Sequence, residues 1–277
     1  MPARAEPSAP SLAEAALLGI LHGPAELLPV SSSGHLTLIP WLLGREASGR
    51  DPEERKAFEV ALHAGTAAAL MIALRGEVGE ALTGLDRRRV TLVAGSFLPP
   101  AVAGLALERP IERRLGTPAT IAAGLIAGSV AMLVADRAPR ERRAAEAGLA
   151  DALWLGAAQA CALAPGVSRG GATLAAARLR RFRRPDAGEL SRHVALPVIV
   201  GAVTLKGVRL RRRRLPPGAG PALAAGTAAS FISALAVAGL ARRVDRDRSL
   251  APYAAYRLAL AAVTLGRIRA LRENRAR

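Results

Sequence analysis

Long apolar stretches alternate with short basic segments along the chain. The stretch 219–240 has no charged side chain over 22 positions, and the stretch 115–135 has none over 21. At about 1.5 Å per residue, a helix of this length crosses a hydrocarbon core of roughly 30 Å. Four further apolar stretches carry isolated polar residues, at 58–74, 90–107, 190–205 and 251–266. Six such stretches predict an all-α integral membrane protein with about six transmembrane helices.

Two segments place polar groups inside otherwise apolar sequence. The first, at 19–35, contains a carboxylate (Glu26), three adjacent serines and two histidines. The second, at 156–173, contains the sequence Val-Ser-Arg-Gly-Gly, whose cation is Arg169. Because polar and charged groups are costly to bury in a membrane, both segments indicate a functional site.

Each polar segment contains its own helix breaker. Pro29 interrupts the first segment, and Pro165 with Gly166 interrupts the second. The serines that follow can cap a new helix. Helix, loop and helix within about 25 to 30 residues are too short for two full spans. We therefore expect two re-entrant helical hairpins, with their irregular backbone covered by protein or by a water-filled cavity.

A shift of the sequence by 137 residues aligns the two segments. The aligned pairs are Leu12 and Leu149, Ala13 and Ala150, Glu14 and Asp151, Gly19 and Gly156, His22 and Gln159, Ala25 and Ala162, Val30 and Val167, Ser31 and Ser168, and Gly34 and Gly171. Inverted repeats in membrane proteins often meet through broken helices at a polar site. We therefore expect one polytopic domain over 1–277, with a first repeat at about 11–136 and a second at about 148–268.

The formal net charge of +17 does not indicate a nucleic-acid partner here. The arginines lie in short blocks between apolar stretches, which is typical of loops that contact anionic headgroups. These blocks are at 87–89, 178–184, 209–214 and 242–248. No nucleic-acid motif or aromatic platform accompanies them. The single cysteine, Cys161, excludes an intrachain disulfide.

The residue types in the two segments suit phosphate chemistry. Arg169 precedes two glycines, so a bidentate cation lies beside exposed backbone N–H groups, as in a phosphate site. His22 and Glu26 are four residues apart, so they share a helix face and could handle a proton or hold a divalent cation. Ser32 or His35 could attack phosphorus or bond a phosphate oxygen.

Structural roles are the alternative for several of these residues. A serine triplet after proline is commonly a helix cap. His63 fits a structural hydrogen bond and a site residue equally well, and Gln159 fits packing or the site. His193, beside an arginine, is expected at the membrane interface.

These motifs resemble a known family. Glu-Leu-Leu-Pro-Val-Ser-Ser-Ser-Gly-His at 26–35 and Pro-Gly-Val-Ser-Arg-Gly-Gly-Ala-Thr at 165–173 are similar to the two signature segments of the undecaprenyl-diphosphate phosphatase family, the bacitracin-resistance type. The segments 58–66, 98–104 and 196–202 also resemble intervening helices of that family, in the same order.

The resemblance implies an enzyme that removes the terminal phosphate of a C55 polyprenyl diphosphate and so recycles a cell-wall lipid carrier. It also implies six transmembrane helices and two re-entrant hairpins in an inverted repeat, in the bacterial cytoplasmic (inner) membrane, with the site facing outward. By the motif, the catalytic residues are Glu26, Ser32, His35 and Arg169. The residues expected to bind the phosphates are Ser31, Ser33, Gly34, Gly166, Ser168, Gly171 and Thr173.

The chain departs from the family pattern at two site positions. The family usually has Glu or Gln where this chain has His22, and Ser where it has Gly170. The change at His22 bears on the acid/base step or on binding of a divalent cation, Mg²⁺ or Ca²⁺. The alternatives to the enzyme are a polyprenyl-phosphate transporter or flippase and a non-catalytic lipid-binding homologue. The expected partners are the polyprenyl diphosphate lipid and the membrane, with a homodimer as the alternative to a monomer and no nucleic acid.

Overall fold

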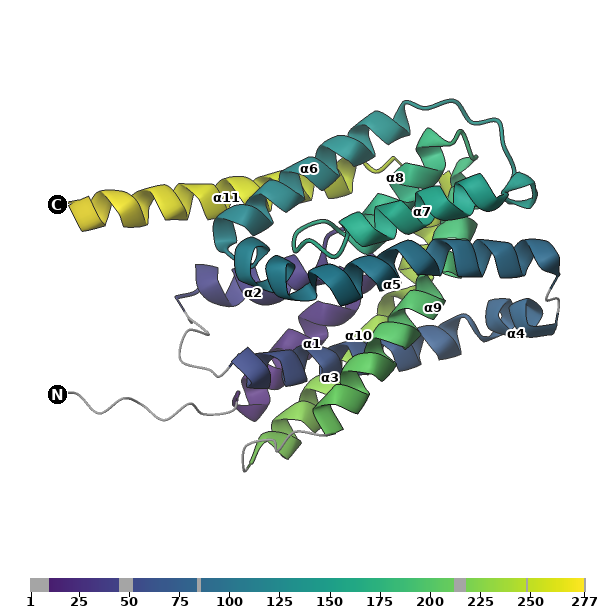
Figure 1. The fold of residues 1–277 in the computed structure, drawn as a ribbon. Coiled ribbons are helices and arrows are strands. Elements are labelled where there is room, and N and C mark those ends of the chain that lie inside the picture. Colours follow the sequence, from purple (N-terminus) through teal and green to yellow (C-terminus); the bar gives the residue numbers. More distant parts are fainter. Residues whose placement is uncertain (1–9, 45–51, 84–85, 212–217, 248, 277) are drawn as a thin grey trace.

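Helices make up almost all of the computed structural model, which describes residues 10–44, 52–83, 86–211, 218–247 and 249–276. Within these ranges there is no β-strand, and Arg142 and Phe182 form an isolated bridge. Figure 1 shows one bundle of helices, from which the C-terminal part of α11 projects. The elements are α1 Leu12–Leu27, α2 Ser32–Leu42, α3 Pro52–Ala73, α4 Arg75–Thr83, α5 Arg87–Leu115, α6 Pro118–Asp136, the 3₁₀ turn η2 Ala144–Glu146, α7 Leu149–Cys161, α8 Arg169–Leu179, α9 Arg184–Arg211, α10 Ala219–Asp247 and α11 Ala251–Ala276. The predicted all-α class is confirmed.

Among the described residues, four helices are long and apolar enough to cross a membrane. They are Arg55–Ala73 in α3, Arg87–Leu107 in α5, Pro118–Asp136 in α6 and Ala219–Arg242 in α10. These coincide with four of the six apolar stretches in the sequence. The other two stretches lie in α9 and α11, helices of 28 and 26 residues that also carry many polar side chains. That α9 and α11 cross the membrane stays a prediction.

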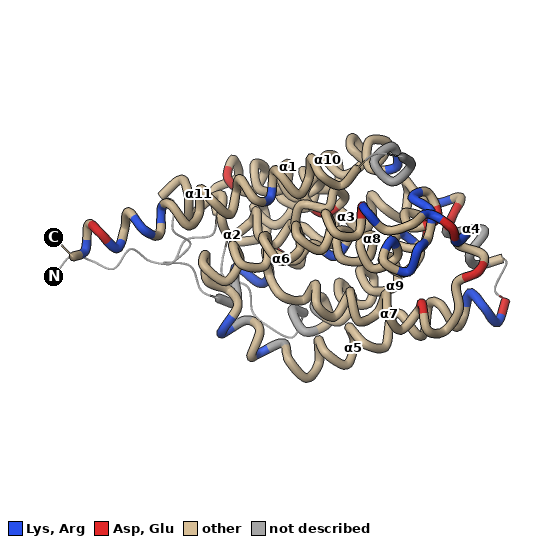
Figure 2. Tube along the Cα trace, turned by 90° about the horizontal axis from the view of Figure 1, so that it is seen from above, with Lys and Arg blue, Asp and Glu red and all other residues tan. Residues whose placement is uncertain are grey.

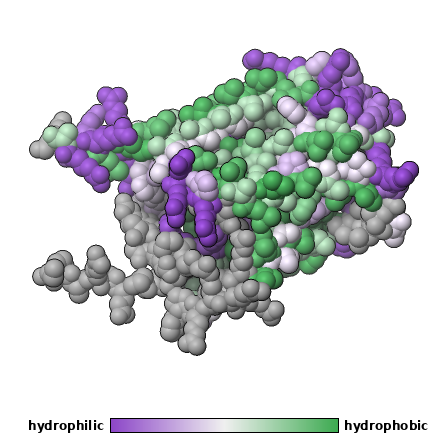
Figure 3. All heavy atoms as spheres, viewed as in Figure 1, coloured by the Kyte–Doolittle hydropathy of each residue, from purple (hydrophilic) through white to green (hydrophobic). Residues whose placement is uncertain are grey.

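The surface of the bundle is that of a membrane protein. Charged residues gather toward its two ends, with a largely uncharged band between them (Figure 2), and apolar side chains cover much of the middle of the face seen in Figure 3. Large apolar side chains stay exposed on the helices, and Leu105 and Ile232 are each 65% exposed. Contiguous apolar surface of this kind is unfavourable in water and favourable in lipid. Parts of two arginine blocks, 212–214 and 248, lie outside the described residues.

The two polar segments both fold as helix, loop and helix. α1 has 16 residues, α7 has 13, and α2 and α8 have 11 each, so all four are shorter than the roughly 20 residues of a full span. The loops are 28–31 and 162–168. In each loop a serine caps the second helix: the Gly34 N–H donates to Ser31 Oγ at 3.4 Å, and the Gly171 N–H donates to Ser168 Oγ at 3.2 Å. Both caps occupy the positions that the 137-residue shift aligned.

Helix contacts follow one pattern in the two halves of the chain. α1 and α3 pack against α10, while α7 and α9 pack against α5. α3 also packs against α9, and α6 against α11. Each helix of the first half has a counterpart in the second half: α7 for α1, α9 for α3, α10 for α5 and α11 for α6. When the counterparts are exchanged, the same set of helix contacts results.

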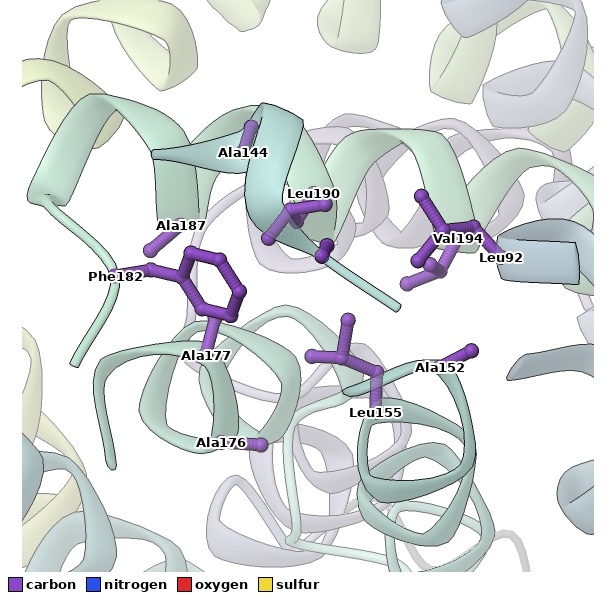
Figure 4. Packing of buried hydrophobic residues seen from close by; sticks show 11 residues of the cluster. Leu92, Ala144, Ala152, Leu155, Ala176, Ala177, Phe182, Ala187, Leu190 and Val194 are labelled. Carbon is purple, nitrogen blue, oxygen red and sulfur yellow. The ribbon is translucent and has the colours of Figure 1, made fainter. Parts of the chain in front are cut away.

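Both hairpins approach a partner helix closely through glycine, and the second also covers a larger hydrophobic core. On α1, a Cβ at Gly19 would lie 2.5 Å from the Gly226 carbonyl oxygen of α10, and one at Gly23 would lie 2.2 Å from Ser233 Oγ. Glycine thus allows α1 to approach α10 closely. On α7, a Cβ at Gly156, the position aligned with Gly19, would lie 2.8 Å from Pro99 Cδ of α5. The α7–α8 hairpin also covers a hydrophobic core around Phe182 (Figure 4). That core contains Leu92, Ala144, Ala147, Ala152, Leu155, Ala176, Ala177, Phe182, Ala187, Leu190 and Val194.

Candidate active site

Glu26, near the C-terminal end of α1, joins the two hairpins through its carboxylate. The Ser32 hydroxyl, on the first residue of α2, donates to Glu26 Oε2 at 2.5 Å. Arg169 Nη2, on the first residue of α8, donates to Glu26 Oε1 at 2.9 Å. The N-termini of α2 and α8 therefore meet at one carboxylate. Their free first-turn N–H groups and the guanidinium together form a site suited to a phosphate.

The contact between Ser32 and Glu26 has the geometry of a nucleophile and its base. A hydroxyl becomes a better nucleophile when a carboxylate within hydrogen-bond distance can take its proton. The ion pair beside it is shielded from solvent, since the Arg169 and Glu26 side chains are 20% and 8% exposed. Shielding strengthens the attraction of the Arg169 guanidinium for a bound anion and for the Glu26 carboxylate.

Two histidines lie next to Glu26. His22 is fully buried one turn earlier on α1, and His63 is partly exposed on α3. His63 Nε2 lies 3.6 Å from Glu26 Oε2, and the two imidazole rings meet edge to face with centroids 4.5 Å apart. One donor atom from each of His22, Glu26 and His63 lies within 4.8 Å of the others. His63, for which the sequence left two roles open, therefore belongs to the site.

His35 lies on α2 but faces away from this group. Its Nδ1 bonds the Ser31 carbonyl oxygen at 2.7 Å, and its Nε2 bonds the Tyr256 hydroxyl at 2.6 Å. The two rings also stack with centroids 5.5 Å apart. Both imidazole nitrogens are thus engaged in holding the first loop to α11. Among the described residues no hydrogen bond joins His35 to Glu26, Ser32 or Arg169.

The residues predicted to bind phosphate mainly shape the two loops. Besides capping α2, Ser31 has a positive φ of 80°, and its Oγ lies 3.4 Å from Ser33 Oγ. The Thr173 hydroxyl hydrogen-bonds Ser191 Oγ at 2.6 Å, and it also contacts the carbonyl oxygen of Arg169 at 3.0 Å. The remaining predicted residues are Gly34 and Gly171 in the first turns of α2 and α8, Ser168 at the α8 cap, and Gly166 in the second loop with a φ of 93°.

Arg257, which the sequence analysis did not single out, ties the two loops together. This fully buried side chain of α11 donates from Nη1 to the Pro29 carbonyl at 3.1 Å and from Nη2 to the Gly166 carbonyl at 3.0 Å. It also bonds the Leu125 carbonyl at 3.2 Å and the Ser129 hydroxyl at 3.2 Å, both on α6. The sequence could have indicated a role for Arg257, because it is a charged residue within the apolar stretch 251–266.

A cleft opens onto Glu26 and Arg169 from between α3, α9 and α10. Two more arginines line it, Arg192 and Arg242, and Gly170 forms part of its floor. Its apolar lining residues are Leu27, Pro29, Leu70, Ala73, Leu74, Leu174, Ala195, Leu196, Ile199, Ala238 and Ala241. The cleft therefore combines cationic groups for an anionic headgroup with apolar walls for a hydrocarbon chain.

Two polar residues that the sequence singled out lie elsewhere. Gln159 on α7 donates from Nε2 to the Ser96 carbonyl of α5 at 3.1 Å, so its role is in helix packing. His193 Nδ1 lies 3.9 Å from Glu189 Oε1, one turn earlier on α9. Neither hydrogen-bonds Glu26, Ser32 or Arg169 in the described part of the chain.

Comparison with known proteins identifies the family. Residues 15–263 match the sequence model of the family described as "Bacitracin resistance protein BacA". The chain belongs to this family. An undecaprenyl-diphosphatase of Geobacter sulfurreducens is 42% identical over 259 residues, which are 88% of this chain and 93% of that protein. Proteins of the same name from Pelobacter propionicus and Rubrobacter xylanophilus are 38% and 36% identical over 90% and 91% of this chain, and over 94% and 96% of their own lengths. The resemblance carried by the two motifs is confirmed.

Proposed function

We propose that the chain is a membrane phosphatase that hydrolyses the terminal phosphate of undecaprenyl diphosphate and releases undecaprenyl phosphate for reuse in cell-wall synthesis. The observation that carries this proposal is the carboxylate of Glu26, which bonds both the Ser32 hydroxyl and the Arg169 guanidinium at the N-termini of two helices. The BacA family membership and the names of the relatives support the same substrate.

The geometry supports a two-step reaction. The diphosphate binds Arg169 and the first-turn N–H groups of α2 and α8. Ser32 Oγ attacks the terminal phosphorus while Glu26 accepts its proton, the P–O bond to the bridging oxygen breaks, and undecaprenyl phosphate leaves with the electron pair. Water then attacks the phosphoserine, which releases inorganic phosphate and restores the Ser32 hydroxyl. Ser32 is the better nucleophile candidate than His35, because both nitrogens of His35 already have partners.

Purified protein in detergent tests the activity with C55 diphosphate as substrate and release of inorganic phosphate as readout. Wild type should release phosphate, and Arg169→Ala should lower kcat/KM about 100-fold, or about 3 kcal/mol of transition-state stabilisation. Arg269→Ala is a matched control, since that arginine is 84% exposed on α11 and pairs with Glu273. A well-folded wild type that releases no phosphate would favour the transporter or the lipid-binding homologue instead.

We further propose six transmembrane helices and two re-entrant hairpins in an inverted repeat, in the cytoplasmic membrane with the cleft facing outward. The exchangeable helix contacts and the matched serine caps support the repeat. Thr83 and Thr117 flank the two ends of α5, and so they should lie on opposite sides of the membrane. In a Cys161→Ser background, an impermeant maleimide added to intact cells should label Thr83→Cys and spare Thr117→Cys.

Light scattering of the solubilised protein distinguishes a monomer from the proposed alternative, a homodimer.

A further inference from the structure

The residues beside Glu26 do not match the ligands that Mg²⁺ and Ca²⁺ prefer. Those hard cations take oxygen ligands, usually several carboxylates and carbonyls. In the described part of the chain the cluster has one carboxylate, Glu26, beside the two imidazoles of His22 and His63. Imidazole suits first-row transition ions such as Zn²⁺ and Co²⁺, and two histidines with one glutamate form a known three-ligand set for zinc.

Hydrogen bonds fix which nitrogen of each histidine is free to bind. The Thr66 hydroxyl donates to the Leu62 carbonyl at 3.2 Å, so its oxygen accepts the proton of His22 Nδ1 at 2.8 Å. His63 Nδ1 donates in the same way to the Glu59 carbonyl at 2.8 Å. In both rings Nε2 therefore carries the lone pair. This is the arrangement in which metal-binding histidines are usually held, with the second nitrogen bonded to an outer group.

The lone pairs are left without a compatible partner. His22 Nε2 is buried and has no hydrogen-bond partner among the residues that the structure describes. His63 Nε2 lies 3.6 Å from Glu26 Oε2, so in the neutral ring two lone pairs face each other. A cation between them removes this repulsion. The candidate ligand atoms of the three residues lie within 4.8 Å of one another, whereas two ligands of one tetrahedral zinc ion lie about 3.3 Å apart, so the three groups would draw together around a bound ion.

We propose that His22, Glu26 and His63 form a binding site for a divalent transition ion of the zinc class, in preference to Mg²⁺ or Ca²⁺. The remaining coordination position would take water or a phosphate oxygen. Arg169 contacts Glu26 Oε1, so Oε2, which accepts from Ser32 and lies 3.6 Å from His63 Nε2, is the carboxylate oxygen that would face the ion. Any role in phosphate release rests on the proposed function, whereas the metal site itself can be tested without substrate.

Cobalt absorption measures the site directly. The full chain, freed of any polyhistidine tag and treated with chelator, is titrated with Co²⁺ in detergent, and the visible spectrum of the bound ion is recorded. We expect one Co²⁺ per chain, displaced by Zn²⁺ but not by the same concentration of Mg²⁺ or Ca²⁺. His22→Gln and His63→Gln should each weaken Co²⁺ binding roughly 100-fold or more. His193→Gln is the matched control, since that histidine lies outside the cluster, and it should bind Co²⁺ as wild type does.

Two further variants separate ligand loss from misfolding. Thr66→Val keeps the side-chain shape but removes the acceptor of the His22 proton, so Co²⁺ binding should weaken roughly 10- to 100-fold. His22→Glu restores an oxygen ligand and should shift the preference toward Mg²⁺ and Ca²⁺. Monodisperse variants that all keep the wild-type cobalt spectrum and affinity, or wild type that binds no Co²⁺, would overturn the site.

Phosphate release measured on the same preparations separates the two proposals. If wild type hydrolyses C55 diphosphate in excess chelator and binds no Co²⁺, the metal site is wrong and the phosphatase stands. If Co²⁺ binds through the three residues but no phosphate is released under any metal condition, the metal site stands and the phosphatase is wrong.

Discussion

The α1–α2 and α7–α8 hairpins share an outline but are held in the bundle differently. Around α7–α8, Asp151 is 3% exposed and receives hydrogen bonds from Arg142 at 2.8 Å, from Arg180 at 2.7 Å and from the Gly148 N–H at 3.0 Å. The guanidinium of Arg142 also stacks over Phe182, 4.2 Å from the ring centroid. This hairpin thus has ion pairs and a hydrophobic core of its own, both away from the cleft.

The α1–α2 hairpin is held through the site, through close backbone approach and through a smaller hydrophobic core that contains Ala15, Phe58 and Leu62. Its α1 helix lies against α10 with Gly19 and Gly23 at the contact. Its polar side chains Glu26 and Ser32 bond each other, and Glu26 also bonds Arg169. The first hairpin therefore carries the nucleophile and base, and the second presents a cation from a well-supported helix. Substitutions in the first should change chemistry more than stability, and substitutions around Asp151 should do the reverse.

Among the substitutions that test this difference between the hairpins, Ser32→Ala should have the largest effect on activity. Loss of the nucleophile should lower phosphate release about a thousand-fold or more, as removal of catalytic nucleophiles does in other hydrolases. The free energy of unfolding should change by only about 1 kcal/mol, because one hydrogen bond is lost. Ser33→Ala is the neighbouring control: its hydroxyl contacts Ser31 rather than Glu26, so activity should fall less than about tenfold. Near-normal turnover by Ser32→Ala would assign the attack to water or to another residue.

Asp151→Asn tests the second hairpin, with thermal unfolding as the readout. Two partly exposed arginines lose a buried countercharge, which should cost about 2 kcal/mol and lower Tm by about 4–8 °C. Glu141→Gln is the control, because that carboxylate pairs with Arg181 where both are 54% exposed, and its loss should cost less than about 1 kcal/mol.

The effect of Asp151 should also depend on pH. Burial alone raises the pKa of Asp151, but hydrogen bonds from Arg142, Gly148 and Arg180 outweigh it and lower the pKa from 3.8 to about 2. A carboxyl group with a lowered folded-state pKa stabilises the protein above its unfolded pKa and loses that contribution as the pH falls. The gap in Tm between wild type and Asp151→Asn should therefore shrink between about pH 5 and pH 2. A gap of constant size over this range would show that the carboxylate charge is not what stabilises the hairpin.

The smallest effect is expected from Gly170→Ser. The space around the Gly170 Cβ position is open within 4 Å, and the residue lines the cleft. The serine that the family usually carries should fit without strain, and phosphate release should stay within about threefold of wild type. A large loss of activity would mean that the added hydroxymethyl group obstructs substrate binding in the cleft.

Local sequence patterns were sufficient to predict the parts of the site that lie on one segment or on a repeated motif. The four-residue spacing of His22 and Glu26 placed both on one helix face, and the Ser-Arg-Gly-Gly sequence placed Arg169 at a helix start. The helix breakers predicted both hairpins. The all-α class and four apolar spans followed from composition and length alone.

The remaining site residues depend on how distant helices pack. His63 reaches Glu26 only because α3 lies beside α1 and α10. The hydrophobic periodicity within one helix does not specify which helix will pack beside it. His35 belongs to the signature motif, yet Tyr256, 221 residues away, turns it toward α11. Arg257 had a visible signal as a cation within an apolar stretch, but its partners are backbone carbonyls, which any sequence supplies.

The position of Arg257 along the chain has a consequence for synthesis of the protein. Both loops precede α11, and the carbonyls that Arg257 binds in them come from Pro29 and Gly166. Because synthesis begins at the N-terminus, both hairpins are made before the residue that joins their loops. The tie between the two loops can therefore form only after α11 has been made. A nascent chain halted before α11 would carry the full signature sequence but lack this tie.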